Sequence, residues 1–400
     1  MRWILIVGVV LAQDTLRFMA YNLLRYGATP GYCNTACKDA QLRTIVGFLR
    51  PSVLGVNEIA PASALIQRVL DSVLNVNGVS YWRSSTYANP SGSDIVNALF
   101  YDSRRLEWIK QELVTTQGGL RDIYAYHLYY KEPAPIIDTL FVVVIVSHLK
   151  AGNAASDSQI RAQAGNAIKQ YIQSLPAARR RFVVDMGDHN LYSSSEVAYQ
   201  NITAVLADPA PAGPWSGNAA YAYYHTQSTR TAALADGGTS GGLDDRFDFI
   251  FFSPECTTST ARARYIPGTF KVVGQDGQRF NQAINSTPLP AGYPVSVINA
   301  LYAMSDHLPV VADFALSVTP YTTSVEKSVV IHTPCLYEIE GSTLYLTANA
   351  PCQVEIWNLR GEMYLRLALV PGQRQEVELP MGVYLLRAGE GFVKRIGILP

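Results

Sequence analysis

Eight polar residues, in short groups between residues 22 and 307, are of the types that metal-assisted hydrolysis uses. They are Asn22, Glu58, His148, Asp188, Asn190, Asp248, Asp306 and His307. A carboxylate can hold a hard divalent ion, and such an ion clamps phosphate oxygens and neutralises charge in the transition state. A histidine oriented by a carboxylate, or an aspartate beside the water, can take the proton that an attacking water loses. Asparagine and a second histidine can donate hydrogen bonds to the phosphate oxygens. This set suits hydrolysis of a phosphodiester.

These residues share a position, because each lies at or near an end of a segment that is predicted to be a core strand. In FVVDMGDHN, the apolar run Phe182–Val184 breaks at Gly187 and is followed by Asp188 and Asn190. The other predicted strands are 16–21, 53–56, 95–101, 121–130, 139–146, 247–252 and 309–314. Ligand sites of mixed α/β folds lie at strand ends. Singly, each residue also fits a turn or a satisfied core position, but one shared site explains them together.

Helical periodicity alternates with these strands. Apolar residues recur at helical spacing in 42–49, in 65–73 after Pro61, and in 160–172. Ser156 and Gln159 match a capping box for the last of these helices. The segment 208–242 is rich in Gly, Ala, Ser and Pro and is predicted to be a loop. Strands that alternate with helices predict a mixed α/β domain.

Length and charge limit the possible functions. The 400 residues are enough for two domains and a large core. Lys and Arg together number 32, as do Asp and Glu, so the formal net charge is zero. Nothing in this balance indicates a strongly basic nucleic-acid-binding protein. An anionic substrate remains compatible with it if a divalent cation supplies the local positive charge.

The N-terminus has the pattern of a short signal peptide, residues 1–12. Arg2 precedes an apolar run, 3–11, and the small residues Val10 and Ala12 would stand at positions −3 and −1 of a cut before Gln13. The run is too short to span a bilayer as a helix, and no later stretch qualifies. We expect an exported protein without a transmembrane segment. The alternative is a buried first strand.

Five cysteines fit an oxidising compartment. Cys33 and Cys37 lie four residues apart in a loop, and Cys335 and Cys352 lie near the C-terminus. Each of these pairs could form a disulfide. Cys256 is left over and is expected to be buried as a small apolar residue.

In their order along the chain, the motifs resemble the endonuclease/exonuclease/phosphatase superfamily, the deoxyribonuclease-I-like fold. The resemblance covers about residues 15–316. With Asn22, it rests on VNE at 56–58, SHLKAG at 147–152, GDHN at 187–190, DRFDFIF at 245–251 and SDHLPV at 305–310. It implies an α/β (α+β) fold, a four-layer α/β sandwich of two mixed β-sheets flanked by helices.

The resemblance also implies how the site works. Glu58 would bind the metal, with help from Asn22 and Asp306, and the cofactor would be Mg²⁺, or else Mn²⁺ or Ca²⁺. His307 would pair with Asp248 as an acid–base dyad.

Other residues would handle the water and the phosphate. The resemblance gives Asp188 and Asn190 the positioning of water and phosphate, and makes His148 the second catalytic histidine. Arg121 and Asn97 are candidate contacts to the substrate phosphate. Whether His307 or Asp188 takes the proton stays open.

His189 departs from the family pattern, which usually has an aromatic residue at this place in GDxN. A neutral imidazole could fill the same packing role, or it could act as a further ligand or proton carrier. We favour packing, because alternate residues at the end of a strand point away from each other.

The C-terminal part differs in kind. Residues 317–333 are rich in Ser, Thr and Val without helical period and are predicted to be a linker. Residues 334–400 contain short alternating segments separated by turns and predict a small all-β sandwich. LPMGVY and the terminal KRIGIL resemble the type IX secretion sorting domain of Bacteroidetes-type bacteria. A carbohydrate-binding or adhesive β-module is the alternative.

Together these features predict a secreted or cell-surface, divalent-metal-dependent phosphodiesterase, with an endonuclease as the leading hypothesis. The expected partners are nucleic acid or another phosphodiester substrate, and the type IX secretion machinery. The chain is expected to be a monomer. The alternatives are a sphingomyelinase-like or other phosphoesterase of the same superfamily, and a non-catalytic surface-binding protein.

Overall fold

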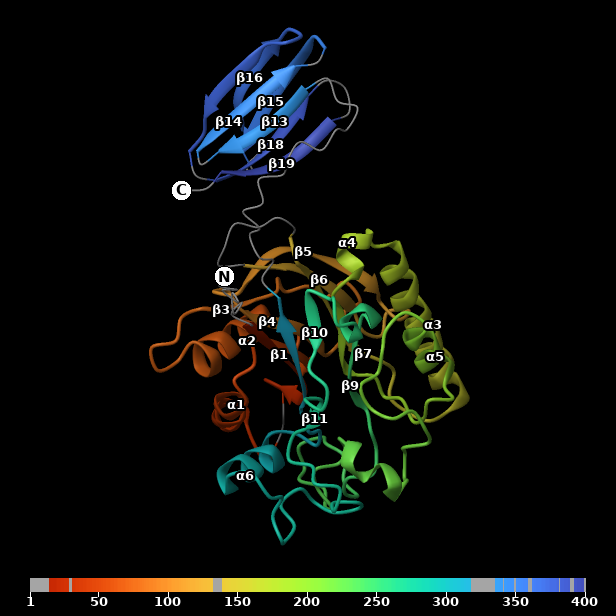
Figure 1. Ribbon diagram of the computed structural model, residues 1–400. Coiled ribbons are helices and arrows are strands. Elements are labelled where there is room, and N and C mark those ends of the chain that lie inside the picture. Colours follow the sequence, from red (N-terminus) through yellow and green to blue (C-terminus); the bar gives the residue numbers. More distant parts are fainter. Residues whose placement is uncertain are drawn as a thin grey trace, which may run out of the picture. The chain divides into compact units, whose positions relative to one another are not determined.

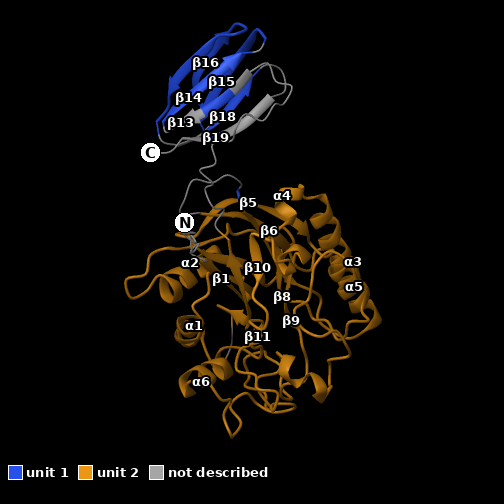
Figure 2. Ribbon diagram, viewed as in Figure 1, with its two compact units in different colours: residues 1–11, 132–139, 318–400 blue, residues 12–131, 140–317 orange. Residues whose placement is uncertain are grey.

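The structure is a computed structural model that describes residues 14–28, 31–131, 139–317, 335–340, 342–348, 350–358, 362–380, 382–388 and 392–398. The predicted signal peptide lies outside these residues, as does the predicted linker except for Ser317. The chain divides into two compact units (Figure 2). The larger unit comprises residues 12–131 and 140–317, and the smaller one comprises 318–400 with 1–11 and 132–139.

The larger unit contains two mixed sheets. The first has the order β10-β12-β1-β2-β4-β3, and β11 also pairs with β12. Its strands are β1 Asp14–Tyr26, β2 Val53–Ile59, β3 Trp82–Ser84, β4 Val96–Asp102, β10 Ala263–Tyr265, β11 Lys271–Val272 and β12 Val310–Leu316. The second has the order β5-β6-β7-β8-β9. Its strands are β5 Leu106–Thr115, β6 Ile123–Tyr130, β7 Phe141–His148, β8 Val183–Asp188 and β9 Asp248–Phe252. The pairs β1–β2 and β7–β8 are parallel.

Helices cover the outer face of each sheet (Figure 1). On the side of the first sheet lie α1 Thr35–Leu49, α2 Ser63–Val69 with the π-helical turn η1 Leu70–Leu74, and α6 Val295–Met304. On the side of the second lie α3 Ala155–Ser174, α4 Ala177–Arg180 and α5 Val197–Thr203. Two 3₁₀ turns, η2 Ala219–Tyr224 and η3 Pro254–Thr257, lie in the connections. This order of helix, sheet, sheet and helix confirms the predicted fold class.

Strand alternation produces these layers, because successive side chains of a strand point to opposite faces. On β8, Val184 and Met186 join the apolar core that also contains Phe18 of the first sheet. Val183, which points to the opposite face, joins the separate cluster that contains Ile168 of α3. The two sheets therefore face each other across one core, and a second core lies beneath α3 and α5.

Several details differ from the sequence predictions. The capping box at Ser156 is wrong, because α3 begins at Ala155 and the N–H of its N-cap, Ala154, donates to Asp157. Periodicity also does not predict β5, α5 or α6. Apart from Leu106, β5 is partly or fully exposed, as an edge strand can be, and α6 is too uniformly apolar to show a polar face.

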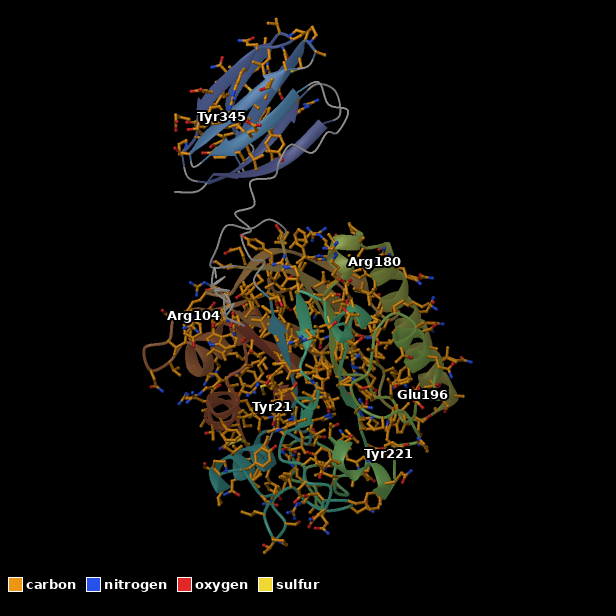
Figure 3. All side chains as sticks on the ribbon, in the orientation of Figure 1. Tyr21, Arg104, Arg180, Glu196, Tyr221 and Tyr345 are labelled. Carbon is orange, nitrogen blue, oxygen red and sulfur yellow. A yellow bond between two sulfur atoms is a disulfide. The ribbon has the colours of Figure 1, made fainter. Side chains whose placement is uncertain are left out.

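The smaller unit is all-β. One sheet has the order β13-β14-β17 and the other β16-β15-β18-β19. Their strands are β13 Cys335–Glu340, β14 Thr343–Ala348, β15 Cys352–Asn358, β16 Met363–Leu369, β17 Arg374–Glu378, β18 Gly382–Ala388 and β19 Phe392–Ile398. Leu344 of the first of these sheets packs in one apolar cluster with Val354 and Leu386 of the second. This shared core confirms the predicted small sandwich. On its surface the Arg374 guanidinium lies 4.4 Å from the ring of Tyr345, which is labelled in Figure 3.

The cysteine predictions have different outcomes. Cys33 and Cys37 form a disulfide, as expected, with 5.3 Å between their Cα atoms. The possible disulfide between Cys335 and Cys352 is not formed, because Cys352 is a free cysteine. The two cysteines lie on β13 and β15, which belong to different sheets. Cys256 is free and buried. Among the described residues, no helix is long and apolar enough to cross a membrane.

Candidate active site

Strand direction brings the predicted residues to one end of the two sheets. Each strand of the two parallel pairs carries one of them at or near its carboxyl end: Asn22 on β1, Glu58 on β2, His148 on β7 and Asp188 on β8. The antiparallel strands start at the same end. Asp248 is the first residue of β9 and pairs with Asp188, and Asp306 and His307 lie just before β12.

The side-chain amide of Asn22 joins the two sheets at this end. Its Nδ2 donates to Glu58 Oε1 at 3.1 Å and to Asp188 Oδ2 at 3.0 Å. Its Oδ1 accepts the Leu24 N–H at 2.9 Å, so the amide cannot rotate freely. The second oxygen of Glu58, Oε2, accepts the Arg25 N–H at 3.1 Å. Two carboxylates from different sheets are therefore held on one amide.

This arrangement uses an uncommon backbone. Leu24, Arg25 and Glu58 have φ values of 48°, 52° and 61°, in the left-handed region. For non-glycine residues each such conformation costs on the order of 1–3 kcal/mol and is found mainly at functional sites. Here it allows the end of β1 to present the Arg25 N–H to Glu58, and the β1–β2 register shifts at this point.

His307 and Asp248 form a buried pair. The distance from His307 Nδ1 to Asp248 Oδ2 is 2.7 Å, and His307 Nε2 lies 3.7 Å from Asp188 Oδ2. Burial by itself lowers the pKa of His307, but the charges of Asp248 and Asp188 outweigh burial and raise that pKa well above its ordinary value. The other oxygen of Asp248, Oδ1, is buried without a hydrogen-bond partner among the described residues.

Asp188 lies between the two histidines. Its Oδ2 is 3.4 Å from His148 Nε2. Burial raises the pKa of Asp188 to about 7; the charge of His307 opposes this rise, and the charges of Asp248 and Glu58 add to it. Burial also lowers the pKa of His148 well below its ordinary value, and the charges of Arg121 and His307 act in the same direction.

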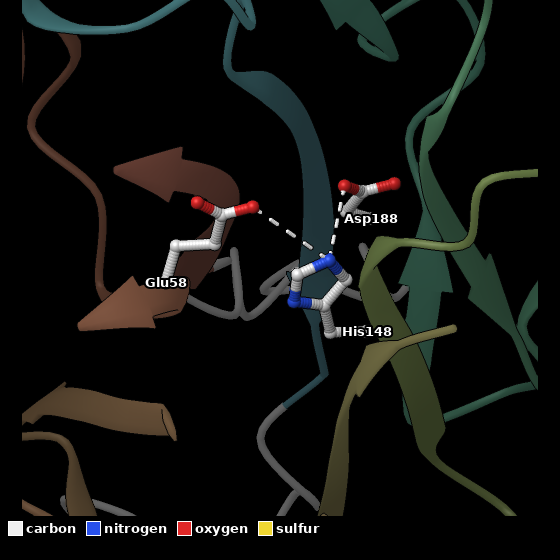
Figure 4. Close-up of side chains that lie close together, drawn as sticks. All are labelled: Glu58, His148 and Asp188. Atoms are coloured by element: carbon white, nitrogen blue, oxygen red, sulfur yellow. Dashed lines mark ion pairs between the residues drawn. The ribbon is translucent and has the colours of Figure 1, made fainter. Parts of the chain in front are cut away.

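Glu58, His148 and Asp188 form a candidate metal centre (Figure 4). One ligand atom from each residue lies within 4.8 Å of the others, and His148 Nε2 is 3.9 Å from Glu58 Oε1. Two carboxylates and a histidine kept neutral by burial can all donate lone pairs, and the carboxylate oxygens suit a hard divalent ion. The residues present therefore fit the metal that the sequence predicts, although of these three the sequence predicts only Glu58 as a ligand.

Asp306 lies outside that group of three. Its Oδ2 accepts from the Thr239 N–H at 2.7 Å and from Thr239 Oγ1 at 2.6 Å, and lies 3.3 Å from Gln227 Nε2. Its Oδ1 is buried without a hydrogen-bond partner among the described residues. An unmatched buried carboxylate oxygen is costly, so a cation or water beside it would be stabilising. A metal role for Asp306 stays a prediction.

The remaining predicted residues surround the centre. The Asn190 N–H donates to Asp188 Oδ1 at 3.0 Å, and Asn190 Nδ2 donates to the Leu149 carbonyl at 3.1 Å. Arg121 donates to the same carbonyl through Nη1 at 2.7 Å, and its charge acts on both Asp188 and Glu58. Both ends of the Asn97 amide are engaged within the protein. Arg121 therefore stays the better candidate for a phosphate contact.

Sequence reasoning missed two amides that hold the site. Asn57 accepts the Asp188 N–H at 3.0 Å and donates to the Ser147 carbonyl at 3.0 Å, which ties β2 to β7 and β8. Its place in VNE, next to Glu58, is a signal that could have found it. Gln227 Nε2 lies 2.6 Å from His307 Nε2, but it comes from the loop rich in small residues, where no pattern marks it.

His189 points away from the centre, as the packing interpretation predicts. It is fully buried against Phe249 and Phe251, with ring centroids 5.5 and 5.1 Å away. Its Nε2 lies 3.2 Å from Asp185 Oδ2 and its Nδ1 lies 3.0 Å from the Gly187 carbonyl. Burial lowers the pKa of His189, but Asp185 and that carbonyl more than compensate, so the pKa is raised.

Comparison with known proteins gives structural likenesses only. No model of a known protein family and no curated protein matches the sequence. TDP2 from D. rerio, complexed with a single-strand DNA product, is 14% identical with a TM-score of 0.48, over 75% of this chain and 99% of that one. An endonuclease/exonuclease/phosphatase from Bacteroides vulgatus is 17% identical with a TM-score of 0.47, over 76% and 100%. The human Nocturnin catalytic domain, with bound sulfate, is 15% identical with a TM-score of 0.45, over 76% and 98%. At such low identity these likenesses assign no function.

Proposed function

We propose that this chain is a divalent-metal-dependent phosphodiesterase of the endonuclease/exonuclease/phosphatase superfamily, and that it cleaves nucleic acid as an endonuclease. One observation carries the proposal: the His307–Asp248 pair and the Asn22–Glu58 pair both meet at Asp188 Oδ2. A basic dyad next to a carboxylate cluster that fits a cation is the arrangement that phosphoester hydrolysis needs.

The residues divide the chemistry between them. A bound divalent ion would neutralise charge on the phosphate, and Glu58, Asp188 and His148 would hold it. His307, kept protonated by Asp248, would exchange the contact of its Nε2 with Gln227 for a phosphate oxygen, donate to that oxygen and stabilise the charge that builds there. Asp188, which lies beside both histidines, would accept the proton of the attacking water. Asn190 and Arg121 are placed to position the phosphate.

The experiment is an assay of the full chain with Mg²⁺, Mn²⁺ or Ca²⁺. The substrates are supercoiled plasmid DNA, RNA, sphingomyelin and a chromogenic phosphodiester, with EDTA and Glu58→Gln as controls. We expect metal-dependent nicking of the plasmid and hydrolysis of the chromogenic substrate. Cleavage of sphingomyelin alone would replace the nuclease with the lipid phosphodiesterase, and no hydrolysis with any ion would reject both.

One structural observation weighs against the lipid substrate. A lipid phosphodiesterase would present exposed aromatic side chains for membrane insertion, and 215–225 is the candidate segment. Trp215 is fully buried against Tyr199 and Phe249, and its Nε1 donates to the Leu191 carbonyl. Of the aromatic residues in this segment, only Tyr223 is exposed. Nucleic acid therefore stays the leading substrate.

We also propose that the protein is exported by way of the signal peptide 1–12 and the sorting domain 334–400, as a monomer. The support is the sequence pattern at each end, together with the independent apolar core of the C-terminal sandwich. Expression in a type IX-competent bacterium, followed by mass spectrometry of cells and medium, tests it. We expect extracellular protein beginning at Gln13. Retention of the full chain inside the cell would contradict the proposal.

A further inference from the structure

A buried lysine that no part of the proposed chemistry uses lies behind the site. Lys38, on the first turn of α1, is 0% exposed. Its Nζ donates to the carbonyls of Leu23, Leu24 and Met304 at 2.7, 2.6 and 2.9 Å. Three acceptors match the three N–H groups of an ammonium, whereas a neutral amine has only two. Burying a charge is expensive unless it is fully hydrogen-bonded, so the arrangement calls for an explanation.

The three carbonyls belong to two segments that lead directly into the site. Leu23 and Leu24 follow Asn22 on β1, and Met304 ends α6, just before Asp306 and His307. One ammonium therefore links the segment that holds Glu58 to the segment that carries the His307 dyad. Within the described part of the chain, the ammonium donates to these two segments alone.

The first of these segments depends on such support. Leu24 and Arg25 have left-handed backbones, and their N–H groups hold Asn22 Oδ1 and Glu58 Oε2. Lys38 binds the carbonyls of Leu23 and Leu24 and so fixes the peptide units on either side of the Leu24 turn. Strained conformations of this kind persist only where the surroundings determine them.

The lysine itself is rigidly held. The Cys33–Cys37 disulfide directly precedes it, Asn34 caps the helix, and the neighbouring Asp39 binds Arg68 at 2.6 Å. Burial lowers the pKa of Lys38 to about 7; the charge of Arg230 adds to this effect and those of Asp236, Asp306 and Glu58 oppose it. The hydrogen bonding favours the ammonium form against this burial.

We propose that Lys38 is a positioning residue, whose ammonium fixes the segment that carries Asn22 and holds Glu58 relative to the segment that carries Asp306 and His307. The effect of Lys38 on metal binding rests on the proposed function. The joining of the two segments by Lys38 does not depend on that function. Residues that orient metal ligands from behind typically change metal affinity or activity by about 10–100-fold when they are replaced.

The first test is hydrogen–deuterium exchange of the metal-free protein, in the wild type and in Lys38→Met. We expect exchange to rise at least ~10-fold at 23–26 and 304–307, because those segments open locally. Exchange should stay unchanged at 126–130, the end of β6 that pairs with the start of β7, away from His148. Lys169→Met is the matched control, since Lys169 donates to Asn201 on the far side of the molecule and should change neither segment. Unchanged exchange at 23–26 and 304–307, or an equal rise everywhere, would overturn the proposal.

The second test is calorimetric titration with Mn²⁺ at a temperature where each variant is folded. Lys38→Met should bind Mn²⁺ at least ~10-fold more weakly than wild type. Lys38→Arg keeps the charge and the donors and should recover most of the affinity. Affinity equal to wild type in folded Lys38→Met would reject a positioning role. If the wild type binds no Mn²⁺, the proposed function fails, and the exchange pattern still decides whether Lys38 joins the two segments.

Lys38→Gln provides the second variant if Lys38→Met yields no folded protein. Its amide has only two N–H groups, on a side chain one atom shorter, so it cannot join all three carbonyls. We expect intermediate exchange and intermediate Mn²⁺ affinity. Wild-type behaviour of Lys38→Gln in both measurements would overturn the proposal as well.

Discussion

Two buried histidine–aspartate pairs lie close together in this protein and differ in one respect. In the first, His189 Nε2 is 3.2 Å from Asp185, and in the second, His307 Nδ1 is 2.7 Å from Asp248. In both, the carboxylate raises the pKa of the histidine against the opposing effect of burial. By residue type, burial and charge, the two pairs are alike.

The two pairs differ in the hydrogen-bond partners of the polar atoms that are not used within the pair. His189 Nδ1 faces the Gly187 carbonyl, and the second oxygen of Asp185 accepts from Ser147 Oγ at 2.6 Å, so that pair is complete. His307 Nε2 instead faces Asp188 and Gln227, and Asp248 Oδ1 has no hydrogen-bond partner among the described residues. A complete pair can only stabilise the fold, whereas an incomplete one has capacity left for a substrate or a proton. We propose that this difference separates a structural pair, His189–Asp185, from a catalytic one, His307–Asp248.

The largest expected effect is on activity, at the incomplete pair. His307→Ala removes the charged donor and should lower kcat by at least ~10³, the scale of lost acid–base and charge stabilisation together. Hydrolysis of the chromogenic phosphodiester at saturating metal measures it. A loss below tenfold in folded protein would show that His307 does not act on the substrate.

The complete pair should give the opposite result. His189→Phe keeps an aromatic ring against Phe249 but leaves Asp185 without its cationic partner. Breaking a buried ion pair typically costs about 3–5 kcal/mol of the free energy of unfolding, which denaturant unfolding measures. The kcat of the folded fraction should stay within about tenfold of wild type, because the ring of His189 packs against Phe249 and Phe251, away from the site. A loss of activity as large as that of His307→Ala would remove the distinction between the pairs.

Glu58→Gln tests the acidic side of the site. It keeps the shape and removes one charge, so we expect kcat to fall by ~10² or more. Stability should change little or increase, because the variant relieves repulsion with Asp188. Near-normal turnover at saturating Mg²⁺ would mean that Glu58 is not a principal ligand.

A third buried histidine, His127, extends the comparison to the pH dependence of stability. Burial lowers the pKa of His127 to about 4; Glu112 opposes this and the charge of Arg179 adds to it. The folded pKa lies below the ordinary value of about 6.5, so the unfolded chain takes up the proton first. Stability from this group is complete above about pH 6.5 and is lost as the pH falls to about 4.

Comparison of wild type with His127→Gln isolates this contribution. The difference in unfolding free energy between them should shrink on acidification from pH 7 to pH 4.5. A constant difference would show that His127 does not titrate in that range.

The parts of the site that the sequence predicts are those marked by a local sequence pattern, and the parts that it misses depend on long-range packing. Local apolar runs mark the strand ends, so the sequence alone identifies Asn22, Glu58, His148, Asp188 and His307 as candidates. One hydrogen bond of Lys38, by contrast, reaches Met304, 266 residues away, and Gln227 reaches His307 from 80 residues away. Such contacts depend on how loops and helices pack, which periodicity does not encode. The same holds for the positive φ of Glu58, which nothing in VNE requires.

The same limit explains why the sequence predicts the metal centre only in part. His148 is expected from sequence to be a catalytic histidine, and its proximity to Glu58 emerges only when β2 and β7 face each other across the two sheets. By contrast, strand alternation and the family resemblance together predict different roles for His189 and His307, although each directly follows an aspartate.

A double-mutant cycle tests the central claim most directly, namely that His307 and Asp248 act as one unit on the substrate. His307→Ala, Asp248→Asn and the double variant are compared in kcat on the chromogenic phosphodiester, with folding checked by thermal unfolding. Residues that act as a unit are strongly non-additive. We predict that Asp248→Asn loses somewhat less than His307→Ala and that the double variant is little worse than His307→Ala alone. Losses that multiply in the double variant would contradict the account, because Asp248 would then act independently of His307.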